Sequence, residues 1–195
     1  MSGAQRSAER PRFPTDERIP RIGRPIRARV VLGIDPGLAT LGYGVIADET
    51  DPRPLAYGCL TTPPGEPLPD RLRSLFEGLA SLRDRYAITD VAMESLFVGS
   101  RLRALSIGEA RGAAIVAVVG TDTVFREYGP SQVKESITGY GKAAKRQVQE
   151  MVRLVLGLQE IPKPDDAADA LAVALCHMRQ LQLSDLLVAA GMARP

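Results

Sequence analysis

Four carboxylates stand where apolar segments end or begin. Asp35 closes a β-branched run, Glu94 follows another apolar run, and Asp166 and Asp169 open an alanine-rich stretch with helical periodicity. On a helix these last two acids project about 60° apart, so they can share one ion. Gathering acids in a buried place raises their pKa values and costs free energy unless a cation compensates their charge. A hard divalent ion takes oxygen ligands and keeps positions for water and phosphate, so the four acids indicate phosphodiester chemistry.

Each acid also has a purely structural explanation. Asp35 could cap the Pro-Gly turn that follows it, and Glu94 could face outward, because strand alternation puts it opposite Met93. Acids are favoured at a helix N-terminus by the helix dipole, and Asp165 is the better candidate for the cap there. Three separate signals in the order strand, strand, helix favour the joint interpretation as a metal site.

The segments between these acids predict an α/β fold with one core, as expected for 195 residues of which 45% are hydrophobic. Short β-branched runs separated by turn residues predict three adjacent antiparallel strands, at 30–35, 42–47 and 55–61. The later periodicities predict a helix at 72–86, a strand at 90–97, a helix at 102–119, a strand at 124–128, and helices at 143–156 and 165–181. The expected architecture is therefore a sheet with helices on its faces.

Composition limits where the protein acts. The sequence has neither an apolar run long enough to cross a bilayer nor a signal-peptide pattern, so we expect a cytoplasmic protein with no membrane partner. Cys59 and Cys176 lack metal-type spacing, which predicts two reduced and at least partly buried thiols.

The N-terminal segment differs from the rest of the chain. Residues 1–28 combine Arg, Pro, Ser and Gly, the composition of a disordered arm. Residues 1–30 hold eight Arg against three acids, a net charge of +5, so the remainder carries −3 of the total of +2. The arm could attract DNA, or it could be a dispensable extension.

Two further features have alternative explanations. The helix at 102–119 is apolar nearly all round, so it must be covered on more than one side, either within one chain or by a second subunit. His177 lies in phase with Asp166 but about 16 Å further along the helix axis, so the two cannot share a metal. We therefore expect His177 to be a partly buried structural residue.

The combined motifs resemble the RuvC family of Holliday junction resolvases over about residues 30–177. The segments that carry the resemblance are 33–37 with 40–46, 93–97, 108–112, 132–134, 147–149 and 166–171. The resemblance implies a ribonuclease-H-like mixed five-stranded sheet flanked by helices. It also implies that the catalytic and metal-binding acids are Asp35, Glu94, Asp166 and Asp169.

The resemblance implies an activity as well. Resolvases of this family are homodimeric endonucleases that cut four-way DNA junctions symmetrically in recombination and repair, leaving 5′-phosphate ends. By this likeness the protein would use two Mg²⁺ ions per subunit, for which Mn²⁺ may substitute, and would cooperate with a branch-migration motor. Residues 29–181 would form the nuclease domain and 182–195 a C-terminal tail, while the segment at 108–119 would build the dimer interface.

The predicted DNA contacts follow the acids along the chain. Phe97 resembles the family aromatic that stacks on an unpaired base, although a packed core Phe is the structural alternative. Lys134 and Lys145 are expected near the cleaved strand, and Arg101 and Arg103 on the loop after Phe97. The remaining candidates belong to a basic run that could also be a solvated face: Tyr140, Lys142 and Arg146.

Two rival functions belong to other classes. The segment 35–40 could begin the phosphate-binding hairpin of an actin-like or sugar-kinase-like ATPase, but the chain is too short for the duplicated domain that those proteins need. A non-catalytic junction-binding scaffold is disfavoured because all four acids are present.

Overall fold

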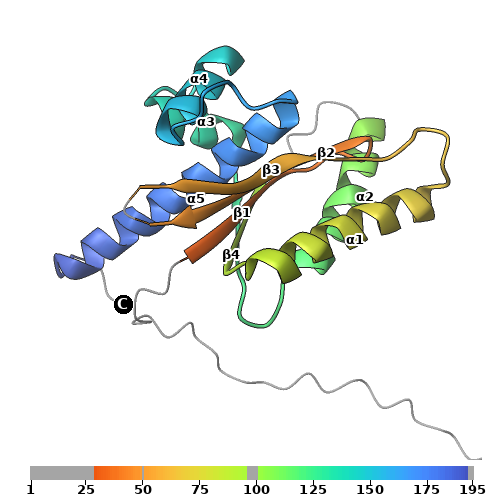
Figure 1. Ribbon diagram of the computed structural model, residues 1–195, viewed down its shortest axis with the longest axis horizontal. Coiled ribbons are helices and arrows are strands. Elements are labelled where there is room, and N and C mark those ends of the chain that lie inside the picture. The colour runs from red at the N-terminus through yellow and green to blue at the C-terminus, as the bar shows by residue number, and fades with distance from the viewer. Residues whose placement is uncertain (1–28, 50, 96–100, 193–195) are drawn as a thin grey trace, which may run out of the picture.

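The computed structural model describes residues 29–49, 51–95 and 101–192, which fold around one mixed five-stranded sheet (Figure 1). Its strands lie in the order β3-β2-β1-β4-β5. Three of them form an antiparallel meander: β1 (Arg29–Asp35), β2 (Thr40–Asp48) and β3 (Arg53–Thr61). The other two continue the sheet parallel to β1: β4 (Asp90–Glu94) and β5 (Val124–Tyr128). The predicted fold, with three antiparallel strands first, is confirmed.

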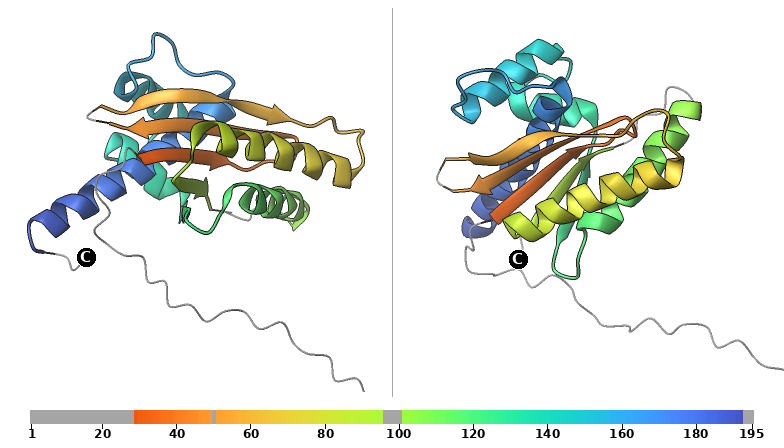
Figure 2. Two further views of the ribbon diagram at one scale, coloured as in Figure 1. Left: turned by 60° about the horizontal axis from the view of Figure 1, so that its bottom comes forward. Right: turned by 45° about the vertical axis from the view of Figure 1, so that its right-hand side comes forward.

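Helices cover both faces of the sheet (Figures 1 and 2). One face packs against α1 (Leu68–Tyr86) and α2 (Arg101–Val118). The other is crossed by α5 (Asp165–Ala189), against which α3 (Pro130–Thr138) and α4 (Lys145–Val155) pack. Alternation along β1 sends Val31 into the core beneath α5 and Leu32 into the opposite core.

Two glycines allow α5 to lie directly on β1 and β2. A Cβ atom at Gly33 would stand 2.1 Å from the carbonyl oxygen of Ala170, and one at Gly42 would stand 2.1 Å from that of Asp166. No side chain larger than hydrogen fits at such distances. Gly42 is also the register partner of Asp35 in the β1–β2 pair. The first turn of α5 is therefore held beside the end of β1.

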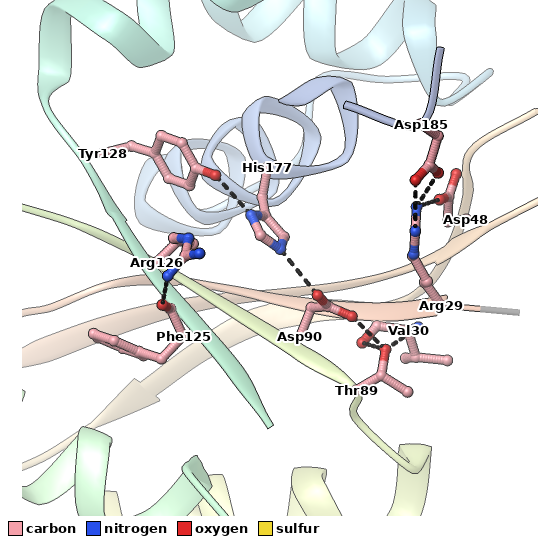
Figure 3. Close-up of polar contacts among 10 residues, drawn as sticks. All are labelled: Arg29, Val30, Asp48, Thr89, Asp90, Phe125, Arg126, Tyr128, His177 and Asp185. Atoms are coloured by element: carbon pink, nitrogen blue, oxygen red, sulfur yellow. Dashed lines mark hydrogen bonds and ion pairs between the residues drawn. The ribbon is translucent and has the colours of Figure 1, made fainter. Parts of the chain in front are cut away.

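Polar contacts, one set buried and one at the surface, fix α5 further along its length (Figure 3). The Nδ1 atom of His177 lies 2.6 Å from the hydroxyl oxygen of Tyr128, and its Nε2 lies 3.2 Å from Asp90 Oδ1. Arg29, at the start of β1, pairs with Asp185 at 2.6 Å. His177 is therefore a structural residue as predicted, and it is fully rather than partly buried.

Element boundaries depart from the predicted ones in several places; α1, for example, begins at Leu68 rather than at residue 72. The fourth strand ends at Glu94 rather than at residue 97, and α5 runs to Ala189, eight residues beyond its predicted end at 181. The N-cap of α5 is Pro164 and makes no side-chain capping bond. The prediction of Asp165 as the cap was therefore wrong, because Asp165 is already the first helical residue.

Helix α3 was not predicted at all, although its signals are present in the sequence. Pro130 occupies the first turn, and Val133 and Ile137 are buried four residues apart. Gly139 ends the helix with a φ of 77°, the left-handed conformation that glycine favours. The helix was missed because it is only nine residues long.

Other expectations from composition agree with the structure. Cys59 is partly buried, Cys176 is buried, and both are free thiols. Within residues 29–49, 51–95 and 101–192, no helix combines the length and apolarity needed to span a bilayer.

Candidate active site

Asp35 is the last residue of β1 and belongs to the strand positions that face α5. Burial of its carboxyl group raises its pKa, and the negative charges of Glu94, Asp169 and Asp166 raise it further, to about 7. Lys145 acts in the opposite direction. The four predicted acids therefore share one electrostatic neighbourhood, although they come from two strands and a helix.

Glu94 ends the neighbouring strand, β4. In the parallel β1–β4 pair Ile34 is the partner of Met93, so Asp35 and Glu94 come at adjacent strand ends. Met93 packs in the core on the α1–α2 side, which leaves Glu94 on the same face as α5. Burial raises the pKa of Glu94, as does Asp169, whereas Lys134 and Lys145 lower it. Glu94 thus does not point outward from an uncovered strand.

Asp166 and Asp169 lie in the first turns of α5. Burial raises the pKa of Asp169, and an ion pair of 3.0 Å with Lys145 partly offsets that effect. Lys145, the first residue of α4, also lies 3.2 Å from Asp165. Its ammonium group is therefore a counter-ion at the edge of the acidic group.

The residues present suit a hard divalent cation, although they do not enclose one as they stand. In the described part of the chain, no three Asp, Glu, His or Cys side chains already form a metal-ligand cluster. Two observations indicate the fit: burial, together with the charges of the other acids, raises the pKa of Asp35 to about 7, and the ammonium group of Lys145 pairs with Asp169. The donors are all carboxylate oxygens, the ligands that Mg²⁺ and Mn²⁺ accept.

Most of the predicted DNA contacts fall on one unit, made of α3, α4 and their connection. Lys134 lies on α3 close enough to Glu94 to lower its pKa. The side chains of three other candidates are exposed around the connection and the start of α4: Tyr140, Lys142 and Arg146. This unit packs against α5, beside the acids.

The remaining DNA-contact candidates belong to the segment after β4. Phe97 lies outside the described residues. Arg101 and Arg103 are in the first turn of α2, so the prediction that they lie on a loop was wrong. Their side chains are not described.

One polar residue at the site was not predicted as functional. The guanidinium group of Arg111, on α2, donates a hydrogen bond of 2.6 Å to the carbonyl oxygen of Glu94 and pairs with Glu127. Its signals in the sequence are its place in the segment 108–112, which resembles the family, and its position just before the apolar run at 113–119.

Sheet order and acid placement together define a nuclease of the ribonuclease-H-like class. The family model for "Crossover junction endodeoxyribonuclease RuvC" matches residues 31–177. The chain is 47% identical over 169 residues to the RuvC of Rubrobacter xylanophilus, covering 86% of this chain and 93% of the relative. It is 50% identical over 150 residues to that of Desulforamulus reducens, covering 76% and 92%.

A solved structure is similar along nearly its whole length. Thermus thermophilus RuvC in complex with Holliday junction substrate superposes with a TM-score of 0.76 at 38% identity, covering 80% of this chain and 96% of that one. The chain therefore belongs to the RuvC family of crossover junction endodeoxyribonucleases. Its members are nucleases that generally depend on a divalent metal ion, and membership excludes the ATPase alternative.

Proposed function

We propose that this protein resolves four-way DNA junctions in recombination and repair, and that Asp35, Glu94, Asp166 and Asp169 are its catalytic acids. The observation that carries the proposal is the gathering of these acids: Asp35 and Glu94 end adjacent strands beside the first turn of α5, and burial and the three other acids raise the pKa of Asp35 to about 7. Such a concentration of charge is unfavourable without a cation, and it stands at the adjacent ends of β1 and β4. The junction bound by the Thermus thermophilus relative supports the choice of substrate.

Asp35 is the central ligand in this proposal, because each of the other three acids raises its pKa. The acids would hold two Mg²⁺ ions per subunit, with Mn²⁺ able to substitute. Bound divalent ions lower the pKa of an attacking water and stabilise the leaving oxygen, so hydrolysis to a 5′-phosphate needs no Ser or Cys nucleophile. Asp35 must lose its proton to serve as a ligand, which its pKa of about 7 permits at neutral pH and above.

The α3–α4 unit would hold the cleaved strand. Lys134 and Lys145 are the predicted contacts whose charges lower the pKa of Glu94, and they would contact the phosphates flanking the cut. Further phosphate contacts would come from Tyr140, Lys142 and Arg146, and from Arg101 and Arg103 at the start of α2. Phe97 would stack on an unpaired base.

Helix α2 supports a proposed homodimer. One side of it is buried against the sheet and α1, but Leu105 is 63% exposed and Val116 is 70% exposed. A Cβ atom at Gly108 or Gly112, between them, would meet nothing within 4 Å. The expectation that one chain might bury this helix completely was therefore wrong. We place the two-fold interface along this stripe, defined by Leu105, Gly108, Gly112 and Val116 and called here the α2 stripe.

The proposed reaction also implies a place and a partner. Four-way junctions arise in chromosomal DNA, so we place the protein in the cytoplasm. A motor that moves the branch point would bring cleavable sequence to the site, and a branch-migration motor is therefore the proposed partner.

Cleavage of a synthetic four-way junction tests the proposal. The wild-type protein is mixed with the junction, or with linear duplex of the same sequence, in Mg²⁺ or in EDTA. We expect paired cuts at symmetry-related positions in the junction only, and only with Mg²⁺. Equal cutting of the linear duplex would contradict the assigned substrate, and equal cutting in EDTA would contradict the metal site.

A further inference from the structure

Arg111 connects α2 to the strand that carries Glu94. The residue is 8% exposed, and its Nη1 donates to the carbonyl oxygen of Glu94 at 2.6 Å. Its Nη2 pairs with the carboxylate of Glu127 on β5. Glu127 is the register partner of Met93, the residue before Glu94. One guanidinium group therefore joins the C-terminal ends of two neighbouring strands to a helix.

This contact falls at the end of the ladder between β4 and β5. The ladder between β4 and β5 ends with Glu94 beside Tyr128, followed by a bond of 2.9 Å from the Ser95 amide to the Tyr128 carbonyl. The Glu94 carbonyl is bound by Arg111 from the α2 side, while the Glu94 carboxylate belongs to the α5 side. Arg111 thus binds the backbone of Glu94 from one face of the sheet, while the Glu94 side chain lies on the other face.

The chemistry of the contact makes it suited to fixing geometry. Hydrogen bonds from a charged guanidinium are stronger than neutral ones, and a planar donor that binds two acceptors restricts their relative orientation. Glu94 is the last residue of its strand, so a small rotation of its peptide would move the carboxylate away from Asp35. Groups that orient a metal ligand without touching the metal commonly change metal affinity when they are replaced.

We propose that Arg111 is a positioning residue for the metal site: it fixes the backbone of Glu94 so that the Glu94 carboxylate can share a divalent ion with Asp35. The inference rests on the proposed function, because it requires Glu94 to be a metal ligand. The proposal also explains Arg111 within the segment 108–112. The two glycines of this segment belong to the α2 stripe, whereas Arg111 has no other part in the proposed function. The competing explanation is that Arg111 only stabilises the fold.

Binding of Mn²⁺ in the absence of DNA separates these explanations. Free Mn²⁺ is measured by electron paramagnetic resonance during titration of the full-length wild type, Arg111→Met and Arg111→Lys. We expect the dissociation constant to rise about tenfold in Arg111→Met, the usual scale for a lost orienting group. Arg111→Lys keeps the charge and should recover part of the affinity.

Arg83→Met is the matched control. The Nη1 atom of Arg83 donates to the carbonyl oxygen of Ala117, near the other end of α2, at 2.8 Å. Like Arg111→Met, this variant loses a hydrogen bond from an arginine to a backbone carbonyl, but the lost bond is at Ala117 rather than at Glu94. We expect a lower melting temperature with unchanged Mn²⁺ affinity.

Three outcomes decide the question. Unchanged Mn²⁺ affinity in Arg111→Met, with only a lower melting temperature, would overturn the inference. If Arg111→Met does not fold, Glu127→Met removes the second acceptor of the guanidinium, and the inference is overturned if that variant binds Mn²⁺ like the wild type. If Asp35→Asn and the wild type bind Mn²⁺ equally, the metal site itself is wrong, whatever Arg111 does.

Discussion

The carboxyl group of Asp35 shows how the fold and the chemistry make opposing demands on one residue. The strand end places it where burial and three other acids disfavour its ionised form, and its pKa rises to about 7. A carboxyl group must be ionised to bind a metal ion. Ionisation of Asp35 is unfavourable in the metal-free protein, and only the binding of a cation offsets that cost. Without metal, the ionised form should destabilise the protein.

The stability of the metal-free protein should therefore depend on pH through Asp35. An unfolded Asp titrates near 3.9, and the folded residue near 7. Stability from the protonated carboxyl is fully present below about pH 4 and is lost as the pH rises through about 7. We expect Asp35→Asn, measured by calorimetry in EDTA, to gain stability relative to the wild type between pH 4 and pH 8. A difference that does not change with pH would contradict the assigned pKa.

Residue types in the sequence predicted which acids come together, but not what touches them. Asp35, Glu94, Asp166 and Asp169 each stand out because an acid interrupts an apolar pattern. Their cationic neighbours do not, because the Lys145–Asp169 pair and the Arg111–Glu94 bond depend on how separate elements pack. Lys145 was predicted as a DNA contact, and its ion pair with the acids appears only in the structure.

At the scale of elements, glycines decide how closely α5 approaches the sheet. Gly42 is opposite Asp35 in the β1–β2 pair and touches the backbone of Asp166. The separation of two of the proposed catalytic acids is thus set by a residue that has no side chain. Neither the positions of the acids in the sequence nor the periodicity of the helix predicts this contact, because it joins segments that are far apart in the chain.

Gly42→Ala should therefore damage the site as well as the fold. Its Cβ would stand 2.1 Å from the Asp166 carbonyl oxygen, so α5 must move away from β2. We expect a loss of about 1–3 kcal/mol in the free energy of unfolding, the usual cost of overpacking, together with a large loss of junction cleavage. Denaturant unfolding and a cleavage assay measure the two effects.

Gly65→Ala is the control for this substitution, because nothing lies within 4 Å of a Cβ there. It should leave stability and cleavage unchanged. Normal cleavage by Gly42→Ala would show that the approach of α5 does not set the position of Asp166.

Strand boundaries marked by turn residues were predicted well, and helices were predicted less well. The antiparallel meander follows from Pro-Gly and acidic turn segments that separate three β-branched runs. Helix α3 was missed because its apolar face consists mainly of Val133 and Ile137. The end of α5 was misplaced because Leu183, Leu186 and Leu187 continue its pattern without a core to cover them.

For the whole molecule, the α2 stripe relates the single chain to the symmetry of its substrate. A two-fold dimer presents two sets of acids, as paired cuts in a four-way junction require. Arg111 lies next to Gly112 in the chain, so the same helix carries both the proposed interface and the contact to Glu94.

Val116→Asp should disrupt the proposed dimer. Val116 is 70% exposed on the α2 stripe, and a charge there would be buried without a partner in the interface. We expect a monomer in sedimentation velocity, with loss of paired cutting. Leu186→Asp is the control, because Leu186 is 67% exposed on α5, away from the stripe, and should leave the oligomeric state unchanged. An unchanged dimer in Val116→Asp would place the interface elsewhere.

The central claim is that four acids make this chain a metal-dependent junction nuclease, and Asp35→Asn tests it most directly. Cleavage and binding of a synthetic four-way junction are measured in Mg²⁺ at pH 8, with Asp165→Asn as the control acid outside the set. We predict that Asp35→Asn lowers the cleavage rate at least about 10³-fold, because transition-state stabilisation of several kcal/mol is lost. Junction binding should persist, and Asp165→Asn should still cleave. Undiminished cutting by Asp35→Asn would contradict the account.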